Sequence, residues 1–398
     1  MKTTNVLLLI TPSSPGRFNG VTDFARANGW HLTVSDRLTH TLDGWTGDGA
    51  LVTLRDDPEM ERKVKSMRRK GIPIVDLSYS RPDIRLPRVA GDNKLIGQIA
   101  AKHFKERCFK NVAWFSTKWG VQHELRCNAF SEGSLTTPER WIWEKAPLRT
   151  KSYDWKSLSK YLTNNLAAIE KPAAIFCFDD ADASCVESAA IAAGYSIPDE
   201  IAILGAGDDE PLCESQIIPI SSVRHDLARI GYEGAKLLAS IMKGEKKPEK
   251  PILIPPRGIA ERASSDTLAT PKGLTGRAKK IYQDNIANPP STEMLASALG
   301  VSRATLDRAF ATDIGMSPGK LLSRLRMDEA KRILRHRNLS VSELAQSLGY
   351  CNSAYFVNVF KKETGVSPRR WKLSHQRLVH PEEAPPLNGG VRENPPVD

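Results

Sequence analysis

Two short motifs occur twice in the last third of the chain. Leu-Ala-Ser-Ala-Leu-Gly at 295–300 returns as Leu-Ala-Gln-Ser-Leu-Gly at 344–349, an offset of 49 residues. Phe-x4-Gly-x-Ser-Pro at 310–318 returns at 360–368, an offset of 50 residues. Each unit has the pattern of a helix, a glycine-containing turn and a second helix, an arrangement that can insert its second helix into the major groove of DNA.

Two alanines and two glycines in these units suit the close packing and the tight turn of a helix-turn-helix. Ala296 and Ala345 allow two helices to cross closely, and Gly300 and Gly349 can adopt the positive φ of a tight turn. The sequence at 326–334 predicts a helix that joins the units. If this helix holds them side by side, their second helices could enter successive major grooves, about 34 Å apart along one face of DNA.

The net charge is concentrated in the same segment. Residues 270–380 hold 19 Lys and Arg against 8 Asp and Glu, a balance of +11, which equals the net charge of the whole chain. The remainder therefore holds 38 of the 57 basic and 38 of the 46 acidic residues, and its charges cancel. A basic segment joined to a neutral one indicates a module that binds a polyanion, although a merely solvated basic surface is the alternative.

The preceding residues, up to about Arg262, alternate between apolar runs and amphipathic patterns. The apolar runs predict buried parallel strands at Val6–Ile10, Gly49–Leu54, Ile72–Leu77, Val112–Ser116, Ala173–Phe178 and Ile201–Gly205. Apolar residues at helical spacing predict helices at Lys94–Arg107, Asp154–Ile169 and Ala181–Gly194. This alternation is typical of doubly wound α/β sheets, and six strands over this length allow two lobes with a cleft between them.

Several other kinds of site are not indicated by the sequence. It contains no G-x-x-x-x-G-K-[S/T], G-x-S-x-G or H-E-x-x-H motif, and Gly205-Ala-Gly207 lacks the third glycine of a dinucleotide fingerprint. The eight histidines form no metal-ligand cluster, and the six cysteines form no C-x-x-C pair. We therefore expect no cofactor, no metal and no catalysis. The longest apolar run near the start has five residues, so we expect a cytoplasmic protein without a membrane span.

Composition divides the chain into four parts. A Lys- and Pro-rich stretch at 246–256 and small polar residues at 264–276 mark the end of the α/β part. We expect a two-lobed sensor at 1–265, a linker at 266–276, a helical DNA-binding domain at 277–378 and a disordered, proline-containing tail at 379–398.

The motifs resemble two known families. Met294–Arg370 looks like the DNA-binding domain of AraC-type transcription regulators, most specifically in Phe-Lys-Lys-Glu-Thr-Gly-Val-Ser-Pro at 360–368. The α/β part is similar to the periplasmic-binding-protein-like sensor of LacI-type regulators. That likeness lies in Val89–Asn93, Ala174–Asp180 and Ile203–Asp209. The combination resembles the regulators of xylose operons, as do Trp45–Gly49, Ile230–Ala235 and Glu261–Asp266.

The resemblance implies which residues would contact DNA. The first recognition helix would begin at Ser302, with Leu306 and Phe310 facing inward. Its outward residues would be Arg303, Ala304, Thr305, Asp307 and Arg308. Arg308 could donate to guanine; Asp307 could accept from cytosine or pair with a nearby arginine.

The second helix would expose Ser353, Ala354, Val357 and Asn358. Family members often carry a basic residue where Asn358 stands, whereas an asparagine could read adenine through N6 and N7. Four basic residues suit phosphate contacts or ordinary solvated surface: Lys361, Lys362, Arg369 and Arg370.

The resemblance also implies a sugar site in the cleft. A pentose needs carboxylates and amides as acceptors, an arginine as donor and an aromatic platform. By match, Asp180, Arg126 and Asp92 would bind the ligand, as would Arg17, which stands where family members place a cleft residue after the first strand. Each of the first three has another possible role: Asp92 or Asp180 could cap a helix, and Arg126 could pair with Glu124 or Glu132. The candidate platforms are Trp114, Trp119, Trp141 and Trp143, each of which could instead belong to the core or surface.

One position departs from the family pattern. The family has Gly-x-Asp after the sixth strand, with the aspartate reaching the ligand, whereas this chain has Gly205-Ala-Gly207-Asp208-Asp209. Either Asp208 replaces the missing carboxylate or the ligand differs.

The resemblance predicts a sugar-responsive DNA-binding transcription regulator. Its partners would be a double-stranded DNA operator, a small sugar such as D-xylose, a second copy of the chain and RNA polymerase, and its targets genes of pentose catabolism. The alternatives are a sugar- or nucleotide-processing α/β enzyme and a regulator of a different small ligand.

Overall fold

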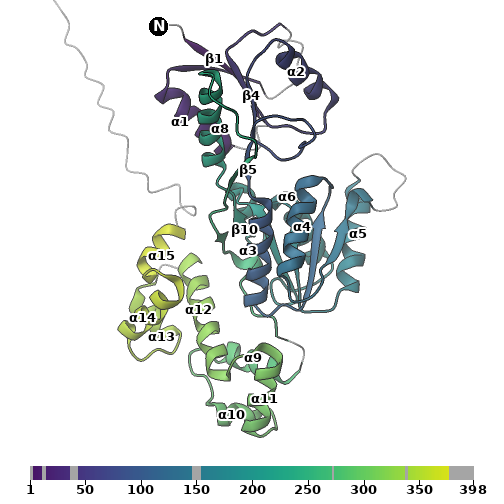
Figure 1. The fold of residues 1–398 in the computed structure, drawn as a ribbon. Coiled ribbons are helices and arrows are strands. Elements are labelled where there is room, and N and C mark those ends of the chain that lie inside the picture. The colour runs from purple at the N-terminus through teal and green to yellow at the C-terminus, as the bar shows by residue number, and fades with distance from the viewer. Residues whose placement is uncertain are drawn as a thin grey trace, which may run out of the picture. The chain divides into compact units, whose positions relative to one another are not determined.

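The computed structural model describes residues 3–10, 15–35, 44–145, 154–270, 273–336 and 339–375. The chain forms two compact units, 1–269 and 270–398 (Figure 1). The predicted disordered tail at 379–398 lies outside the described residues. No described helix is both long and apolar enough to cross a membrane.

The first lobe of unit 1 is built on a parallel four-stranded sheet. Its strand order is β2 (Trp30–Val34), β1 (Thr4–Leu9), β3 (Gly49–Val52) and β4 (Ile74–Asp76). Because side chains alternate along a strand, β1 sends Val6 and Leu8 to one face and Leu7 and Leu9 to the other. The first face packs on α1 (Pro15–Ala27) and α8 (Leu227–Met242), and the second on α2 (Pro58–Arg69).

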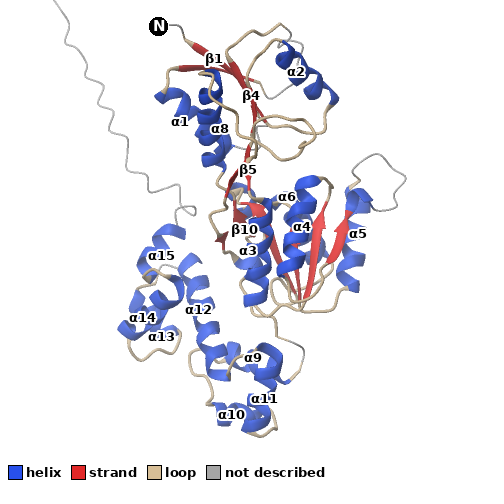
Figure 2. Cartoon of the chain, viewed as in Figure 1, coloured by secondary structure: helices blue, strands red, loops and turns tan. Residues whose placement is uncertain are grey.

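The second lobe has a six-stranded sheet, drawn in red in Figure 2. The order is β12 (Ile259–Ala260), β10 (Ser221–Arg224), β9 (Ile201–Gly207), β8 (Ala173–Cys177), β6 (Asn111–Ser116) and β7 (Glu139–Ile142). Only β12 runs antiparallel to its neighbour. One face is covered by α3 (Asn93–Glu106) and α4 (Val121–Gly133), and the other by α5 (Trp155–Ala168) and α6 (Asp180–Ala192). A short helix, α7 (Glu210–Glu214), follows β9.

The chain passes between the lobes more than once. β5 (Val89–Gly91) pairs in parallel with β11 (Ile252–Ile254), apart from both larger sheets. Helix α8 follows β10 of the second lobe but packs in the first. Both lobes therefore combine segments distant in sequence, as in a doubly wound two-lobed protein.

Glycines set two close helix crossings in unit 1. A Cβ at Gly231 of α8 would stand 2.1 Å from the carbonyl oxygen of Arg17 in α1. A Cβ at Gly97 of α3 would stand 2.3 Å from the carbonyl oxygen of Arg126 in α4. Only glycine permits these approaches, and the second brings Arg126 close to the start of α3.

Unit 1 continues past the predicted domain end at 265. A 3-10 turn at Ala263–Ser265 is followed by Thr267, Leu268 and Ala269, all of which are buried. Ala269 N donates to the carbonyl of Arg107 at 2.9 Å. The first four residues of the predicted linker thus pack on unit 1, and α9 (Leu274–Asp284) begins before that linker was expected to end.

Unit 2 consists of helices in the part that the structure describes. They are α9, α10 (Thr292–Ala298), α11 (Arg303–Ile314), α12 (Pro318–His336), α13 (Val341–Ser347), α14 (Ser353–Thr364) and α15 (Pro368–His375). Ser291, Ser302, Ser340 and Asn352 cap helix N-termini. Gly300 and Gly349 have φ of 69° and 73°, which confirms their predicted turn role.

The helix predicted at 326–334 is the second half of α12, which begins earlier, at Pro318. With 19 residues α12 is roughly 28 Å long at 1.5 Å per residue. Its Met327, Ala330 and Leu334 share one apolar core with Leu344 of α13 and Phe356 of α14. Helix α12 therefore belongs to the core of the second helix-turn-helix unit and also connects that unit to the first.

Candidate ligand site and DNA interface

Polar side chains gather where the strands of the second lobe end. Asp180 follows β8, Gly207 ends β9 and His225 follows β10. The carboxyl ends of parallel strands meet at one edge of a sheet, which is where ligands bind in open α/β folds. This edge also contains Arg126 and His123 of α4. We define the edge cluster as the following residues: Asn93, His123, Arg126, Phe178, Asp180 and His225.

Asp180 is buried and held by hydrogen bonds inside the second lobe. Its Oδ1 accepts from Ser222 Oγ at 2.5 Å, and its Oδ2 accepts from Asp209 N at 2.8 Å. Burial raises the pKa of Asp180 to about 6, and these hydrogen bonds oppose the rise. The predicted alternative of helix capping is wrong for Asp180, because Asp179 caps α6 by accepting from Asp182 N at 2.8 Å.

Space for the Asp180 carboxylate comes from β9. A Cβ at Gly205 would stand 2.3 Å from Asp180 Oδ1, so only a glycine allows the carboxylate to lie there. The neighbouring Asp208, the predicted substitute for the family's aspartate, has a φ of 59°. Its carboxylate pairs with Arg262 at 2.8 Å and Arg224 at 3.4 Å.

Arg126 is almost fully buried and bonded to neutral acceptors. Its Nε and Nη2 donate to Asn93 Oδ1 at 3.2 and 2.7 Å, and Nη1 donates to the carbonyl of Phe178. Its guanidinium lies 4.4 Å from the centre of the Phe178 ring. The predicted pairing with Glu124 or Glu132 is wrong. Burial lowers the pKa of Arg126 to about 10, with Asp179 and Asp180 opposing the shift.

Two histidines complete the edge cluster. The ring of His123 stacks on Phe178 with centroids 3.6 Å apart, and burial and the charges of Arg126 and Lys118 lower its pKa to about 4. Burial, then Arg126 and Arg17, lower the pKa of His225 well below its usual value. Both rings are therefore neutral at pH 7.

The other predicted ligand residues have partners of their own. Asp92 caps α3 by accepting from Leu95 N at 3.0 Å, which was its alternative role. Burial lowers the pKa of Arg17, and Asp76 opposes the shift. Asp76 itself pairs with Arg88 at 2.8 Å.

Two of the four candidate tryptophans lie beside the edge cluster: Trp119 is 6.4 Å from the His123 ring, and Trp114 is 6.3 Å from the Phe178 ring. Trp114, Trp141 and Trp143 are buried in the two cores of the second lobe. The lobes touch here, since Gln122 Nε2 of α4 donates to Ser80 Oγ of the first lobe at 2.9 Å.

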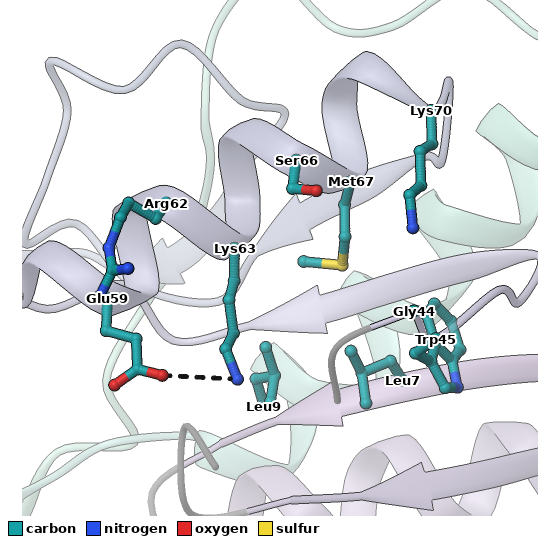
Figure 3. A pocket seen from close by; sticks show the side chains of 10 residues that line it. All are labelled: Leu7, Leu9, Gly44, Trp45, Glu59, Arg62, Lys63, Ser66, Met67 and Lys70. Carbon is teal, nitrogen blue, oxygen red and sulfur yellow. Dashed lines mark ion pairs between the residues drawn. The ribbon is translucent and has the colours of Figure 1, made fainter. Parts of the chain in front are cut away.

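A cavity of about 560 Å³ lies elsewhere, against α2 (Figure 3). Leu7 and Leu9 of β1 form its floor, and Lys63, paired with Glu59 at 3.6 Å, stands on the helix above. It shares none of the edge-cluster residues. The described residues contain no group of three or more His, Cys, Asp or Glu able to hold a metal ion.

In unit 2 the first recognition helix is α11. Leu306 and Phe310 are fully buried, as predicted, and all five predicted outward residues are exposed. Arg303 pairs with Glu293 and, at 3.6 Å, with Asp307. Asp307 therefore has the arginine partner that was one of its two predicted roles, which leaves Arg308 as the more available guanidinium.

The second recognition helix, α14, has a different surface. Ala354 and Asn358 are exposed, whereas Ser353 is half-buried and Val357 packs against the core around Phe360. The predicted phosphate contacts are all exposed: Lys361, Lys362, Arg369 and Arg370.

Sequence reasoning missed several residues that the structure places at these sites. Tyr355 is 62% exposed on α14, and the 50-residue offset that aligns it with Thr305 could have identified it. In the edge cluster His123, Phe178 and His225 were also missed. No motif marks His225, which follows a strand only four residues long.

Comparisons with known proteins agree with this two-part organisation. Residues 101–265 match the family model of a periplasmic binding protein-like domain, and 295–374 match that of a helix-turn-helix domain. The chain is similar to the xylose operon regulatory protein of Haemophilus influenzae, with 24% identity over 87% of this chain and 90% of that protein. It is 23% identical to the protein of that name from Escherichia coli K12, over 89% and 92%.

A solved structure shows the same fold. The structure of a xylose-binding transcription activator matches with a TM-score of 0.62 and 22% sequence identity, covering 94% of this chain and 99% of that one. These relatives are transcription regulators rather than enzymes.

Proposed function

Because the chain is an AraC-type transcription regulator with a periplasmic-binding-protein-like sensor, we propose that it binds a small sugar, D-xylose or a related one, and activates genes of pentose catabolism in response. The choice of D-xylose or a related sugar as ligand is supported by the names of the relatives, which are xylose operon regulatory proteins. The site itself supports a polar ligand, since the edge cluster gathers Arg126, Asn93 and Asp180 beside the Phe178 ring.

The observation that carries the proposal is the pair of helix-turn-helix units joined by one continuous helix, α12. The second unit shares its apolar core with α12, the first is linked to α12 through α9, and the net charge of +11 lies within this part of the chain. A helix of roughly 28 Å is comparable with the about 34 Å between successive major grooves. One chain would therefore contact two turns of an operator, with Arg308 as base reader and Lys361, Lys362, Arg369 and Arg370 on phosphates.

We further propose that the chain acts in the cytoplasm as a homodimer that contacts RNA polymerase. A dimer would place four helix-turn-helix units on the operator, and a change in sensor shape would change their spacing. A ligand shifts such an equilibrium only by its differential affinity for the two states.

The test is DNA binding by the full chain, measured by fluorescence anisotropy on a duplex from upstream of its own pentose genes. We expect it to bind this duplex at least 1000-fold more tightly than a scrambled duplex at the same salt concentration, in the range of specific regulators. Added D-xylose or a related sugar should change this affinity. Equal affinity for both duplexes would refute the proposal.

A further inference from the structure

In and around the edge cluster the carboxylates have hydrogen-bond donors or arginines as partners, whereas Arg126 has no carboxylate partner. The carboxylates around it already have partners: Asp180 holds Ser222 and Asp209 N, Asp179 and Asp92 cap helices, and Asp76 and Asp208 pair with arginines. The arginine in the middle is different, because every acceptor that Arg126 contacts is neutral.

A guanidinium has five N–H donors. Arg126 uses one on Nε, one on Nη1 and one on Nη2, for Asn93 and Phe178. Two N–H groups remain for which no acceptor occurs in the part of the chain that the structure describes. No described carboxylate pairs with Arg126 within 4.0 Å, so a buried positive charge lies at this edge with only longer-range compensation from Asp179 and Asp180.

The histidines add buried nitrogens that can donate. His123 is 8% exposed and its Nδ1 makes no hydrogen bond to any residue described; the same holds for Nε2 of His225. Leaving such groups unsatisfied is costly. Both rings lie within the electrostatic influence of Arg126.

We propose that the sensor's ligand is a sugar bearing an oxyanion, a carboxylate or a phosphate, received by Arg126 together with His123 and His225. This rests on the proposed function and narrows its ligand class. An oxyanion supplies several acceptor lone pairs at one point, which matches the remaining donors. Neutral sugars are usually bound by carboxylate acceptors as well, and here each carboxylate around Arg126 already accepts a hydrogen bond or pairs with an arginine. A neutral imidazole keeps one N–H, so each ring can donate one hydrogen bond to the anion without gaining a proton.

Three pentose compounds with one carbon skeleton separate the possibilities. D-xylose is neutral, D-xylonate carries a carboxylate and D-xylose 5-phosphate a phosphate. We would measure their binding to the full chain by isothermal titration calorimetry at two salt concentrations. We expect at least one of the two anions to bind tenfold or more tightly than D-xylose, with an affinity that falls as salt is raised. The two anions distinguish a carboxylate from a phosphate.

Variants identify the residues responsible. His225→Gln should lower the affinity for the anion about tenfold and change the affinity for D-xylose much less. Arg126→Gln, if it folds, should lower the affinity for the anion further. Lys160→Gln, an exposed charge on α5, is the control and should change neither.

D-xylose binding as tightly as both anions would overturn the inference, and so would the absence of binding by all three. The comparison of operator with scrambled DNA needs no ligand, so in either case it would still decide whether the chain binds DNA sequence-specifically.

Discussion

The carboxylate of Asp180 occupies the space beside Gly207. A Cβ at Gly207 would stand 3.0 Å from Asp180 Oδ2, and the φ of Gly207 is 137°, a conformation that L-residues rarely adopt. The resemblance predicts an aspartate at position 207. In this chain that position is a glycine, and the carboxylate of Asp180, which follows β8, lies next to it. An aspartate there would place two carboxylates in contact, in a backbone conformation that disfavours it.

Gly207→Ala therefore tests how far the site depends on glycine. We expect a loss of about 1–2 kcal/mol in the free energy of unfolding, because the added Cβ is strained and crowds Asp180. Gly207→Asp should cost more, since it adds like charge. Urea unfolding measures both, and an aspartate variant as stable as the natural chain would contradict the contact.

The pH dependence of stability tests the burial of Asp180. Its pKa of about 6 in the folded chain exceeds the about 3.9 of an unfolded aspartate, so the folded state binds more protons between these values. Asp180 therefore supports the fold most at low pH, and this contribution disappears as the pH rises through about 6.

Replacing the carboxyl group removes that dependence. Between pH 5 and pH 7 the free energy of unfolding of the natural chain should fall by about 1 kcal/mol more than that of Asp180→Asn. Asp182, whose pKa is also raised, is present in both proteins, so the difference belongs to Asp180. Identical slopes in urea titrations would show that the carboxyl group is not buried as described.

Helix packing in the first lobe gives another test. Gly231→Ala would place a methyl group 2.1 Å from the Arg17 carbonyl oxygen, and separating α8 from α1 should cost about 1–3 kcal/mol. Gly319→Ala in α12 is the control, because a Cβ there meets nothing within 4 Å and alanine favours helices. Equal thermal stability of the two variants would contradict the close crossing.

The DNA interface predicts different effects for two arginines of α11. Arg308→Ala should cost about 1–3 kcal/mol of operator affinity and relax discrimination at one base pair. Arg303→Ala should cost less, because Arg303 is already paired with Glu293 and Asp307. Anisotropy titrations with single-base operator variants measure both, and the reverse order would show that Arg303 is the base reader.

The second recognition helix can be tested by adding charge. Asn358→Arg should strengthen binding to operator and scrambled DNA alike and steepen the salt dependence by about 0.9, the value for one more phosphate contact. Lys361→Gln should have the opposite effect. A salt slope unchanged by both would mean that α14 lies away from the phosphates.

The sequence predicted more of the fold than of the ligand site. Buried parallel strands such as 173–177 are short apolar runs, and the repeated motifs identified both helix-turn-helix units, because each signal lies within a few neighbouring residues. Strand β10 was missed because Ser-Ser-Val-Arg is polar, and His225 was missed with it.

The partners of the site residues depend on contacts distant in sequence. Asp180 is buried against Ser222, 42 residues away, and Arg126 meets Asn93, 33 residues away. No local pattern predicts such contacts, which explains why the pairing expected for Arg126 with its neighbouring glutamates was wrong.

If one chain couples a sugar ligand to an operator, each must change the affinity for the other, and that reciprocity can be measured. The dissociation constant of the ligand that binds most tightly would be measured for the free chain and for the chain saturated with operator DNA. We expect at least a fivefold difference, and the ligand should change operator affinity by the same factor, as linkage requires. Unchanged ligand affinity on DNA, with unchanged operator affinity when ligand is bound, would show that the two sites are not coupled.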